Sequence, residues 1–283
     1  MAIPEKSELI AKMKSGELIP YLGAGALEGV KNVADGTSIP ADSESLILAM
    51  TGGTPMAPRL MYEFPRAAMH LENKKGRSFL ERFLKKTYAE TDWSDAALHT
   101  WLHSVETPFI IDSNRDLKMQ TLLKDRAHNL IVGAARLAAH PHRFDIYEWV
   151  DGKYQLRPQD LVNTALPTLF KPLGSPEPKP SFVASDADFV DYITELMGGF
   201  AIPAWIKEKR INKQYLFLGM RFTRDTERMV MSDMIYGASE DCAGWALIPE
   251  PTDKEKRFLT KKNVVIIEQD WTSFLKNEVL QAA

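Results

Sequence analysis

Short runs of apolar residues alternate with amphipathic segments along most of the chain. Every position of 215–218 and 264–267 is apolar, which predicts strands buried on both faces. The helical spacing of 186–197, with Ser185 as N-cap and Gly198 as stop, predicts a covering helix. This alternation is typical of a parallel sheet covered on both sides. Strands are expected at 18–22, 109–111, 129–137, 144–150, 166–170, 215–218, 245–248 and 264–267, and helices at 7–15, 43–50, 186–197, 223–235, 253–262 and 271–280.

One region, residues 52–105, departs from this alternation. Gly52-Gly53-Thr54-Pro55 interrupts the chain, and helical spacing then dominates 77–105. We therefore expect a helical insertion around 52–105 that rises over the edge of the sheet. No repeat or low-complexity linker divides the sequence, so the prediction is a single α/β domain, 1–283, with a Rossmann-like open parallel sheet and helices on both faces.

Composition limits the partners of the chain. Hydrophobic residues make up 45% of it, enough for a large core, and the net charge of −3 offers no basic field to hold nucleic acid. The single cysteine, Cys242, excludes an internal disulfide and a cysteine-based zinc site. The start lacks an apolar signal core, and no apolar run approaches roughly 18 residues. We therefore expect a cytoplasmic protein without a membrane partner.

Ligands of open parallel sheets bind at the carboxyl ends of the strands. The first such end carries Gly23-Ala24-Gly25, where the backbone could approach a diphosphate and direct its N–H groups toward it. Glu28 stands where the fingerprint G-x-G-x-x-G requires its third glycine, which disfavours a hydride-transfer enzyme. A tight turn that packs a helix on the strand is the alternative interpretation.

Three further strand ends carry polar residues. Asp112-Ser113-Asn114-Arg115-Asp116 could orient a water, bind an amide or hydrogen-bond a ribose, or could form an Asx turn with a helix cap. Lys171-Pro172-Leu173-Gly174-Ser175 follows the strand at 166–170. Residues 219–225 place glycine after a buried strand and then a helix start with Thr and Arg, which suits a phosphate or ribose. A capped helix with solvated arginines is the alternative there.

In this order, the four strand ends resemble the sirtuin-like family in its bacterial stand-alone branch. Residues 22–26 match the G-A-G turn of that family, and 113–116 match its T-x-N-x-D element in part. Residues 171–175 match the K-x-H-G-S element in part, and 218–225 match a strand that ends in glycine before a polar helix start. The resemblance spans about residues 15–280.

The resemblance implies NAD as the ligand of the cleft. Family enzymes cleave the bond between nicotinamide and ribose, and the acceptor is an acyl-lysine in deacylases and water in NAD hydrolases. By resemblance, the G-A-G turn would hold the diphosphate, the match at 113–116 would lie near the nicotinamide ribose and its amide, and the match at 218–225 would face the adenosine side. The residues so implied are Asn114 and Asp116 for catalysis, and Gly23, Ala24, Gly25, Ser113, Gly219, Arg221 and Asp225 for cofactor binding.

The departures from the family pattern matter as much as the matches. Leu173 stands at the position of the family's active histidine, and leucine cannot accept a proton. Deacylases of the usual kind often carry a four-cysteine zinc module, which this chain cannot form, so deacylase activity is not expected. His99 and His103 share a helix face at a spacing that suits a metal, but no nearby carboxylate pattern completes a site, so no metal is predicted.

Three functions remain open at this point. The chain could bind NAD or ADP-ribose with weak or no deacylase activity, in a regulatory or accessory role; it could hydrolyse NAD, with Asn114 placing the water; or it could be an interaction scaffold with a vestigial pocket. Residues 169–176 and 185–193 also resemble sirtuin-like proteins encoded beside nitrogen-fixation genes, which favours the regulatory role. Six tryptophans and the region 220–234 leave a homo-oligomer or a protein partner open, although such residues more commonly pack in the core.

Overall fold

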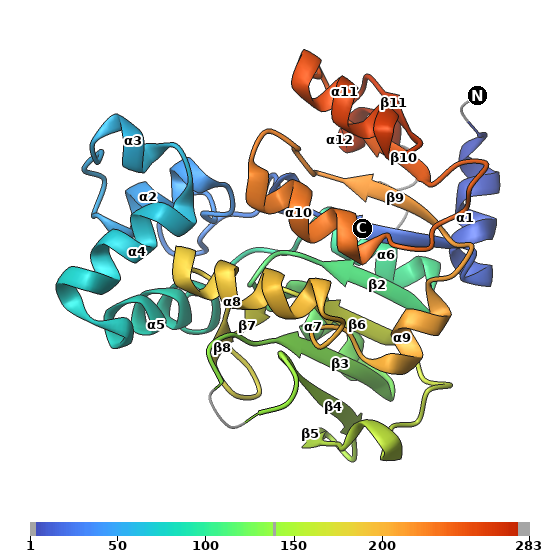
Figure 1. Ribbon diagram of the computed structural model, residues 1–283, viewed down its shortest axis with the longest axis horizontal. Coiled ribbons are helices and arrows are strands. Elements are labelled where there is room, and N and C mark those ends of the chain that lie inside the picture. Colours follow the sequence, from blue (N-terminus) through green and yellow to red (C-terminus); the bar gives the residue numbers. More distant parts are fainter. Residues whose placement is uncertain (1–3, 138–139, 277–283) are drawn as a thin grey trace.

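A single large sheet organises the computed structural model, which describes residues 4–137 and 140–276 (Figure 1). Nine strands follow the order β11-β10-β9-β1-β2-β6-β3-β4-β5, and the first seven in that order are parallel. β3, β4 and β5 pair antiparallel at one edge. The strands are β1 (Leu18–Leu22), β2 (Phe109–Asp112), β3 (His128–Gly133), β4 (Phe144–Val150), β5 (Lys153–Leu156), β6 (Thr168–Lys171), β9 (Gln214–Leu218), β10 (Gly244–Leu247) and β11 (Val264–Ile267), and a separate small pair joins β7 (Gly174–Ser175) to β8 (Ser181–Phe182).

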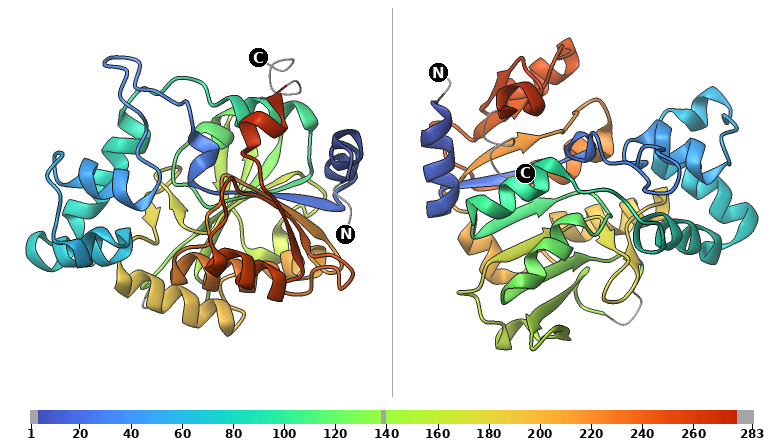
Figure 2. Two further views of the ribbon diagram at one scale, coloured as in Figure 1. Left: turned by 90° about the horizontal axis from the view of Figure 1, so that it is seen from above. Right: turned by 180° about the vertical axis from the view of Figure 1, so that it is seen from behind.

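Helices cover both faces of this sheet, as the sequence predicted (Figure 2). In β1, Leu18 and Leu22 pack into one apolar cluster, whereas Ile19 and Tyr21 pack into the other, because successive side chains of a strand point to opposite faces. The α/β open sheet is therefore confirmed. One face carries α1 (Lys6–Ser15), α6 (Ala97–Val105), α7 (Lys118–Leu122) and α12 (Trp271–Phe274), and the other carries α8 (Asp186–Met197), α9 (Ala204–Lys209), α10 (Asp225–Met234) and α11 (Asp253–Lys261).

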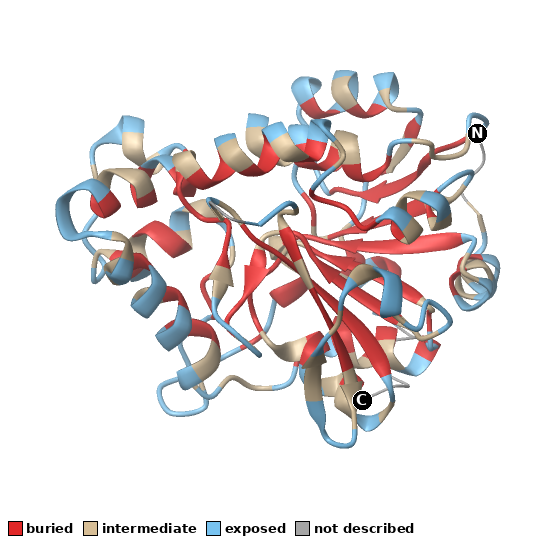
Figure 3. Ribbon diagram, turned by 60° about the horizontal axis from the view of Figure 1, so that its bottom comes forward, coloured by how far each residue is buried: buried red, intermediate tan, exposed pale blue. Residues whose placement is uncertain are grey.

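A helical lobe with its own apolar core lies beside the sheet (Figure 3). Its buried residues include Leu46, Leu71 and Leu84, and none of these three belongs to the two clusters on the sheet. The lobe differs from the predicted insertion at 52–105, because it already includes the helix at 43–50, whereas α6 packs on the sheet through Leu98 and Trp101. Its helices are α2 (Ser43–Met50), α3 (Pro58–Met61), α4 (Phe64–Lys75) and α5 (Arg77–Lys85), followed by the π-helical turn Lys86–Glu90.

Buried ion pairs attach the lobe to the sheet domain. Asp188 of α8 is buried and pairs with Arg77 of α5 at 2.6 Å and with Arg136 at 2.7 Å. Glu72 of α4 pairs with the same two arginines, with Arg136 at 2.7 Å and with Arg77 at 3.4 Å. Because both carboxylates are buried and share the same two arginines, the lobe is held in a defined orientation above the carboxyl ends of the strands.

Some predicted elements change in extent. The chain reverses at Asp151 and Gly152, which both have positive φ, and the antiparallel hairpin β4–β5 results where only a strand at 144–150 was predicted. The strand predicted at 129–137 ends at Gly133. The helix predicted at 271–280 is α12 in its described part, and residues 277–280 lie outside the described residues. Among the described helices, none has the length and apolar character needed to cross a membrane.

Candidate functional site

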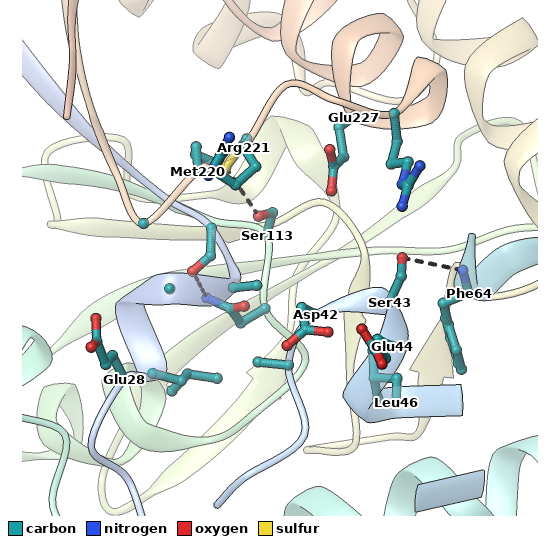
Figure 4. A pocket seen from close by; sticks show the side chains of 18 of the residues that line it. Glu28, Asp42, Ser43, Glu44, Leu46, Phe64, Ser113, Met220, Arg221 and Glu227 are labelled. Carbon is teal, nitrogen blue, oxygen red and sulfur yellow. Dashed lines mark hydrogen bonds between the residues drawn. The ribbon is translucent and has the colours of Figure 1, made fainter. Parts of the chain in front are cut away.

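A cavity of about 910 Å³ opens between the lobe and the carboxyl ends of the strands (Figure 4). One wall comes from the segments that follow six adjacent parallel strands, and the lobe supplies the facing wall. Neighbouring strands lie about 4.8 Å apart, so six strand ends span roughly 24 Å. The cavity is therefore long, and in the order of the sheet it contacts Trp271 after β11, Pro249 after β10, Gly219 after β9, Gly23 after β1, Asn114 after β2 and Leu173 after β6.

The centre of the cavity coincides with the point where the strand order reverses. The chain runs from β1 to β2 on one side, and β9, β10 and β11 lie on the other, which leaves a crevice beyond the ends of β1 and β9. Gly23 and Gly219 follow these two strands directly, and the N–H of Gly25 donates to the carbonyl oxygen of Gly219 at 2.8 Å. A Cβ on Gly219 would lie 2.2 Å from the nitrogen of Ala26, and its φ is +67°. The glycines thus permit a close contact between two backbone segments.

That contact limits what the glycine turn can offer to a diphosphate. Gly23, Ala24 and Gly25 all line the cavity. The N–H of Gly23 donates to Leu218 at 3.0 Å, and the N–H of Gly25 is used by Gly219. Within the described part of the chain, Ala24 is the one residue of the turn whose N–H has no acceptor. Of the three N–H groups in this turn, only that of Ala24 is therefore free to donate to a diphosphate.

The segment after β2 reaches the same wall. The hydroxyl of Ser113 donates to the carbonyl oxygen of Leu22 at 2.6 Å. The side-chain nitrogen of Asn114 donates to Gly23 at 2.9 Å and to Oδ1 of Asp112 at 3.0 Å. The carbonyl oxygen of the Asn114 side chain has no partner among residues 4–137 and 140–276. Asn114 is thus held in place by its nitrogen and keeps one acceptor available.

Asp116 lies outside the cavity wall, in a buried polar cluster. It is 1% exposed, and one carboxylate oxygen accepts from the N–H of Lys118 at 2.7 Å. Ligand atoms of His99, Asp112 and Asp116 lie within 4.8 Å of one another, so the expectation that no carboxylate stands near His99 was wrong. The tertiary structure brings them together from α6 and the end of β2. His103 points elsewhere and pairs with Asp125 at 3.0 Å.

The same cluster contains a fully buried ion pair. The ammonium of Lys171, at the end of β6, lies 2.7 Å from Asp112, and neither side chain is exposed. Burial lowers the pKa of His99, while Asp116 and Asp112 oppose that shift. The positive charge that balances the buried carboxylate of Asp112 thus comes from the side chain of Lys171.

Arg221 and Asp225 differ in their relation to the cavity. The guanidinium of Arg221 forms two hydrogen bonds of 2.8 Å with Glu255 of α11, so its charge is already paired although the residue lines the cavity. Asp225 stands in the first turn of α10, pairs with Arg228 and is not part of the wall. Although burial raises the pKa of Glu255, hydrogen bonds from Arg221, Thr252 and Phe222 outweigh it and lower the pKa to about 2.

Glu255 should therefore make the fold sensitive to acid. Its carboxylate is stabilised in the folded state, and this stabilisation is complete above its ordinary pKa of 4.5 and is lost as the pH falls toward about 2. In urea denaturation between about pH 5 and pH 2.5, the wild type should lose stability more steeply than Glu255→Gln. Asp253→Asn, which removes an exposed carboxylate from the same helix, should follow the wild type. Equal slopes for all three would contradict the assignment.

Several wall residues were not predicted from the sequence. Phe64 and Glu63 come from the lobe, and Arg115 lies over the ring of Phe64 with a centroid distance of 5.6 Å. Glu227 also lines the cavity, and a signal for it was present in the sequence. It precedes Val230, the first of three buried residues of α10, by one helical turn and so continues their apolar face.

Glu227 has an unusual environment for a carboxyl group. Its Oε2 is buried and has no hydrogen-bond partner among the described residues. Burial raises its pKa to about 7, and the neighbouring carboxylate of Glu63 contributes, against a backbone hydrogen bond from Arg224. Figure 4 shows this carboxyl group directed toward the side of the cavity on which Asp42 and Ser43 of the lobe lie.

Comparison with known proteins gives one family. Residues 110–267, more than half of the chain, match the model of the SIR2-like domain. No curated protein sequence matches the chain. The matched region begins within β2 and ends with β11, so it includes the strand ends that carry Asn114, Leu173 and Gly219. The chain belongs to the SIR2-like domain family.

Proposed function

We propose that the cavity binds NAD or ADP-ribose. The observation that carries this proposal is the length of the cavity, which follows six adjacent strand ends over roughly 24 Å. A volume of about 910 Å³ falls in the usual range of about 300–1,000 Å³ for small-molecule sites. SIR2-like proteins as a family have an NAD-related function, and an elongated dinucleotide suits a cavity of this shape.

The wall residues divide the cavity into three parts that suit such a ligand. Leu247 and Trp271 offer apolar surface at the β10–β11 end, which suits the adenine. The free N–H of Ala24 lies near the reversal of strand order, where it is available to donate to a diphosphate. Arg224 lines the cavity too, but its guanidinium lies over the ring of Tyr62. Asn114 and Leu173 lie at the β2–β6 end, which suits the nicotinamide ribose. Gly23, Gly25, Ser113 and Gly219 shape the wall between these parts.

Three of the residues considered from the sequence receive a smaller role in this proposal. Asp116 and Asp225 do not line the cavity, so we assign them no contact with the ligand. Arg221 lines it, but Glu255 already binds its guanidinium, so it contributes to the wall rather than to charge neutralisation. Asn114 keeps the role of orienting a polar group at the nicotinamide end.

The chemistry proposed for the bound dinucleotide follows from Leu173. This side chain lines the cavity, so the position of the family histidine faces the ligand but offers no proton acceptor. A regulatory or accessory role with weak or no deacylase activity is therefore the proposal. Hydrolysis of NAD is a second candidate, which the carboxyl group of Glu227 favours. The cytoplasmic location, a protein partner and the association with nitrogen fixation stay predictions.

A charge placed at Ala24 tests the binding site. Ala24→Asp puts a carboxylate beside the proposed diphosphate, so the affinity for NAD and for ADP-ribose should fall at least tenfold, about 1.4 kcal/mol. Ala24→Ser is the matched control, because it adds a small neutral group, and it should bind nearly as the wild type does. Isothermal titration calorimetry with each ligand measures both effects.

The same titration separates the proposal from its alternatives. A wild-type chain that binds neither ligand at millimolar concentration would favour a scaffold with a vestigial pocket. Equal binding by Ala24→Asp and the wild type would place the diphosphate away from the glycine turn.

A further inference from the structure

The wall that contains Leu173 also contains a carboxyl group. Leu173 packs against the apolar cluster to which Phe189 and Val230 belong, and all three residues line the cavity. Glu227 lines it as well and precedes Val230 by one turn of α10. A titratable group thus lines the same cavity as Leu173, the position that offers no proton acceptor.

The surroundings of Glu227 keep both of its protonation states accessible near neutral pH. Carboxylates face it from two further elements, Glu63 before α4 and Glu255 of α11, and both disfavour its charge. The phenol of Tyr21 in β1 faces it too. Arg224 favours the charged form, and Arg221 also lies within electrostatic range. Burial and the two carboxylates prevail, so the pKa is raised to about 7, which suits a general base at physiological pH.

A purely structural role explains Glu227 less well. A glutamate at the third position of a helix commonly accepts from the N-cap backbone, and Arg224 provides such a bond here. That hydrogen bond uses only one of the two carboxylate oxygens, and a solvent-exposed glutamate could accept it without burying the other oxygen. Instead Oε2 is buried without a partner, next to a second carboxylate, which is unfavourable for the fold. Unfavourable burial of a titratable group in a cavity is typical of functional sites.

We propose that Glu227 is the proton acceptor of this cavity in the hydrolysis of a nicotinamide–ribose bond. The inference rests on the proposed binding of NAD. A water oxygen forms a bond to C1′ of the ribose while the bond from C1′ to the pyridinium nitrogen breaks, and the electron pair of that bond neutralises the nicotinamide. The Glu227 carboxylate takes one proton from the attacking water and later returns it to solvent. The products are nicotinamide, ADP-ribose and one proton.

The first test measures nicotinamide release from NAD by the full chain between about pH 5.5 and pH 8.5. The wild-type rate should rise with pH through about 7, because the carboxylate form is the active one. Glu227→Gln should release nicotinamide about 10²–10⁴-fold more slowly and lose that pH dependence while it still binds ADP-ribose. Asp233→Asn is the matched control, because Asp233 stands on the same helix, has a pKa raised by burial and does not line the cavity. It should behave as the wild type does.

A second test does not depend on turnover. The positive nicotinamide ring favours the carboxylate form of Glu227, so NAD binding near pH 7 should release protons from the wild type. Calorimetry in two buffers of different ionisation enthalpy measures this release, which should be smaller with ADP-ribose and absent in Glu227→Gln.

The outcomes distinguish this inference from the binding proposal. A wild type that does not bind NAD would refute the binding itself. A wild type that binds NAD without releasing nicotinamide, or a Glu227→Gln variant with the wild-type rate, would overturn the role of Glu227 and leave the binding proposal intact.

Discussion

Replacing Lys171 by methionine should lower the free energy of unfolding by about 3–5 kcal/mol. The ammonium of Lys171 lies 2.7 Å from Asp112, and both side chains are fully buried. Methionine matches the length of the lysine stem but leaves the carboxylate of Asp112 without its cation, close to the carboxylate of Asp116. Breaking one partner of a buried pair costs far more than the pair itself contributes, because an uncompensated charge remains in the interior. Urea denaturation followed by circular dichroism measures the loss.

The double variant Asp112→Asn/Lys171→Met is the control for this prediction. Asparagine keeps the oxygen that accepts from the backbone N–H and the side chain of Asn114. With the negative charge removed together with the positive one, most of the lost stability should return. A double variant as unstable as Lys171→Met would show that packing of the lysine stem, rather than its charge, is what stabilises the end of β6.

Replacing Gly219 by alanine should destabilise the fold by about 2–5 kcal/mol and abolish ligand binding. Its φ of +67° costs an alanine about 1–2 kcal/mol. The added Cβ would also lie 2.2 Å from the nitrogen of Ala26 and 2.8 Å from the Cα of Gly25, and such overpacking costs about 1–3 kcal/mol more. The two backbone segments must separate, which moves the glycine turn away from the end of β9. Thermal denaturation and titration with ADP-ribose measure the two effects.

The variant Gly36→Ala is the control, because it measures the cost of a positive φ without a steric clash. Gly36 has a φ of +74°, close to that of Gly219, but a Cβ there meets no atom within 4 Å. It should therefore lose only about 1–2 kcal/mol and bind as the wild type does. If Gly219→Ala and Gly36→Ala lose equal stability, the close contact between the two turns contributes nothing.

Patterns local in the sequence predicted the layers of the fold. The all-apolar run at 215–218 became β9, which is buried on both faces and needs no polar position. The run at 264–267 became the edge strand β11, whose two central residues are only partly buried. Ser185 is the N-cap residue of α8, as its place before an amphipathic run indicated, and its backbone N–H donates to the carboxylate of Asp188 in the first turn. The antiparallel pairing of β4 with β3 and β5 was not predicted, because the apolar pattern of a strand does not show whether its neighbour runs parallel or antiparallel to it.

The strand-end motifs also located the cavity, although they did not define how it works. Gly23, Asn114, Leu173 and Gly219 line one wall, because the carboxyl ends of parallel strands meet at one edge of the sheet. The hydrogen bonds of Gly23 and Gly25 to the end of β9 and the turn after it could not be predicted, because the partners are almost 200 residues away in the chain. Those bonds decide that only the N–H of Ala24 remains free.

The sequence by itself thus determined an α/β sheet with helices on both faces and the order of the motifs at its strand ends, because each of these depends on burial patterns within a few residues. Only the tertiary structure decided which groups share an environment. It placed Glu63 of the lobe beside Glu227 of α10, and it brought His99 to Asp112 and Asp116. The protonation of these groups depends on burial and on charges from distant segments, and no local pattern encodes that.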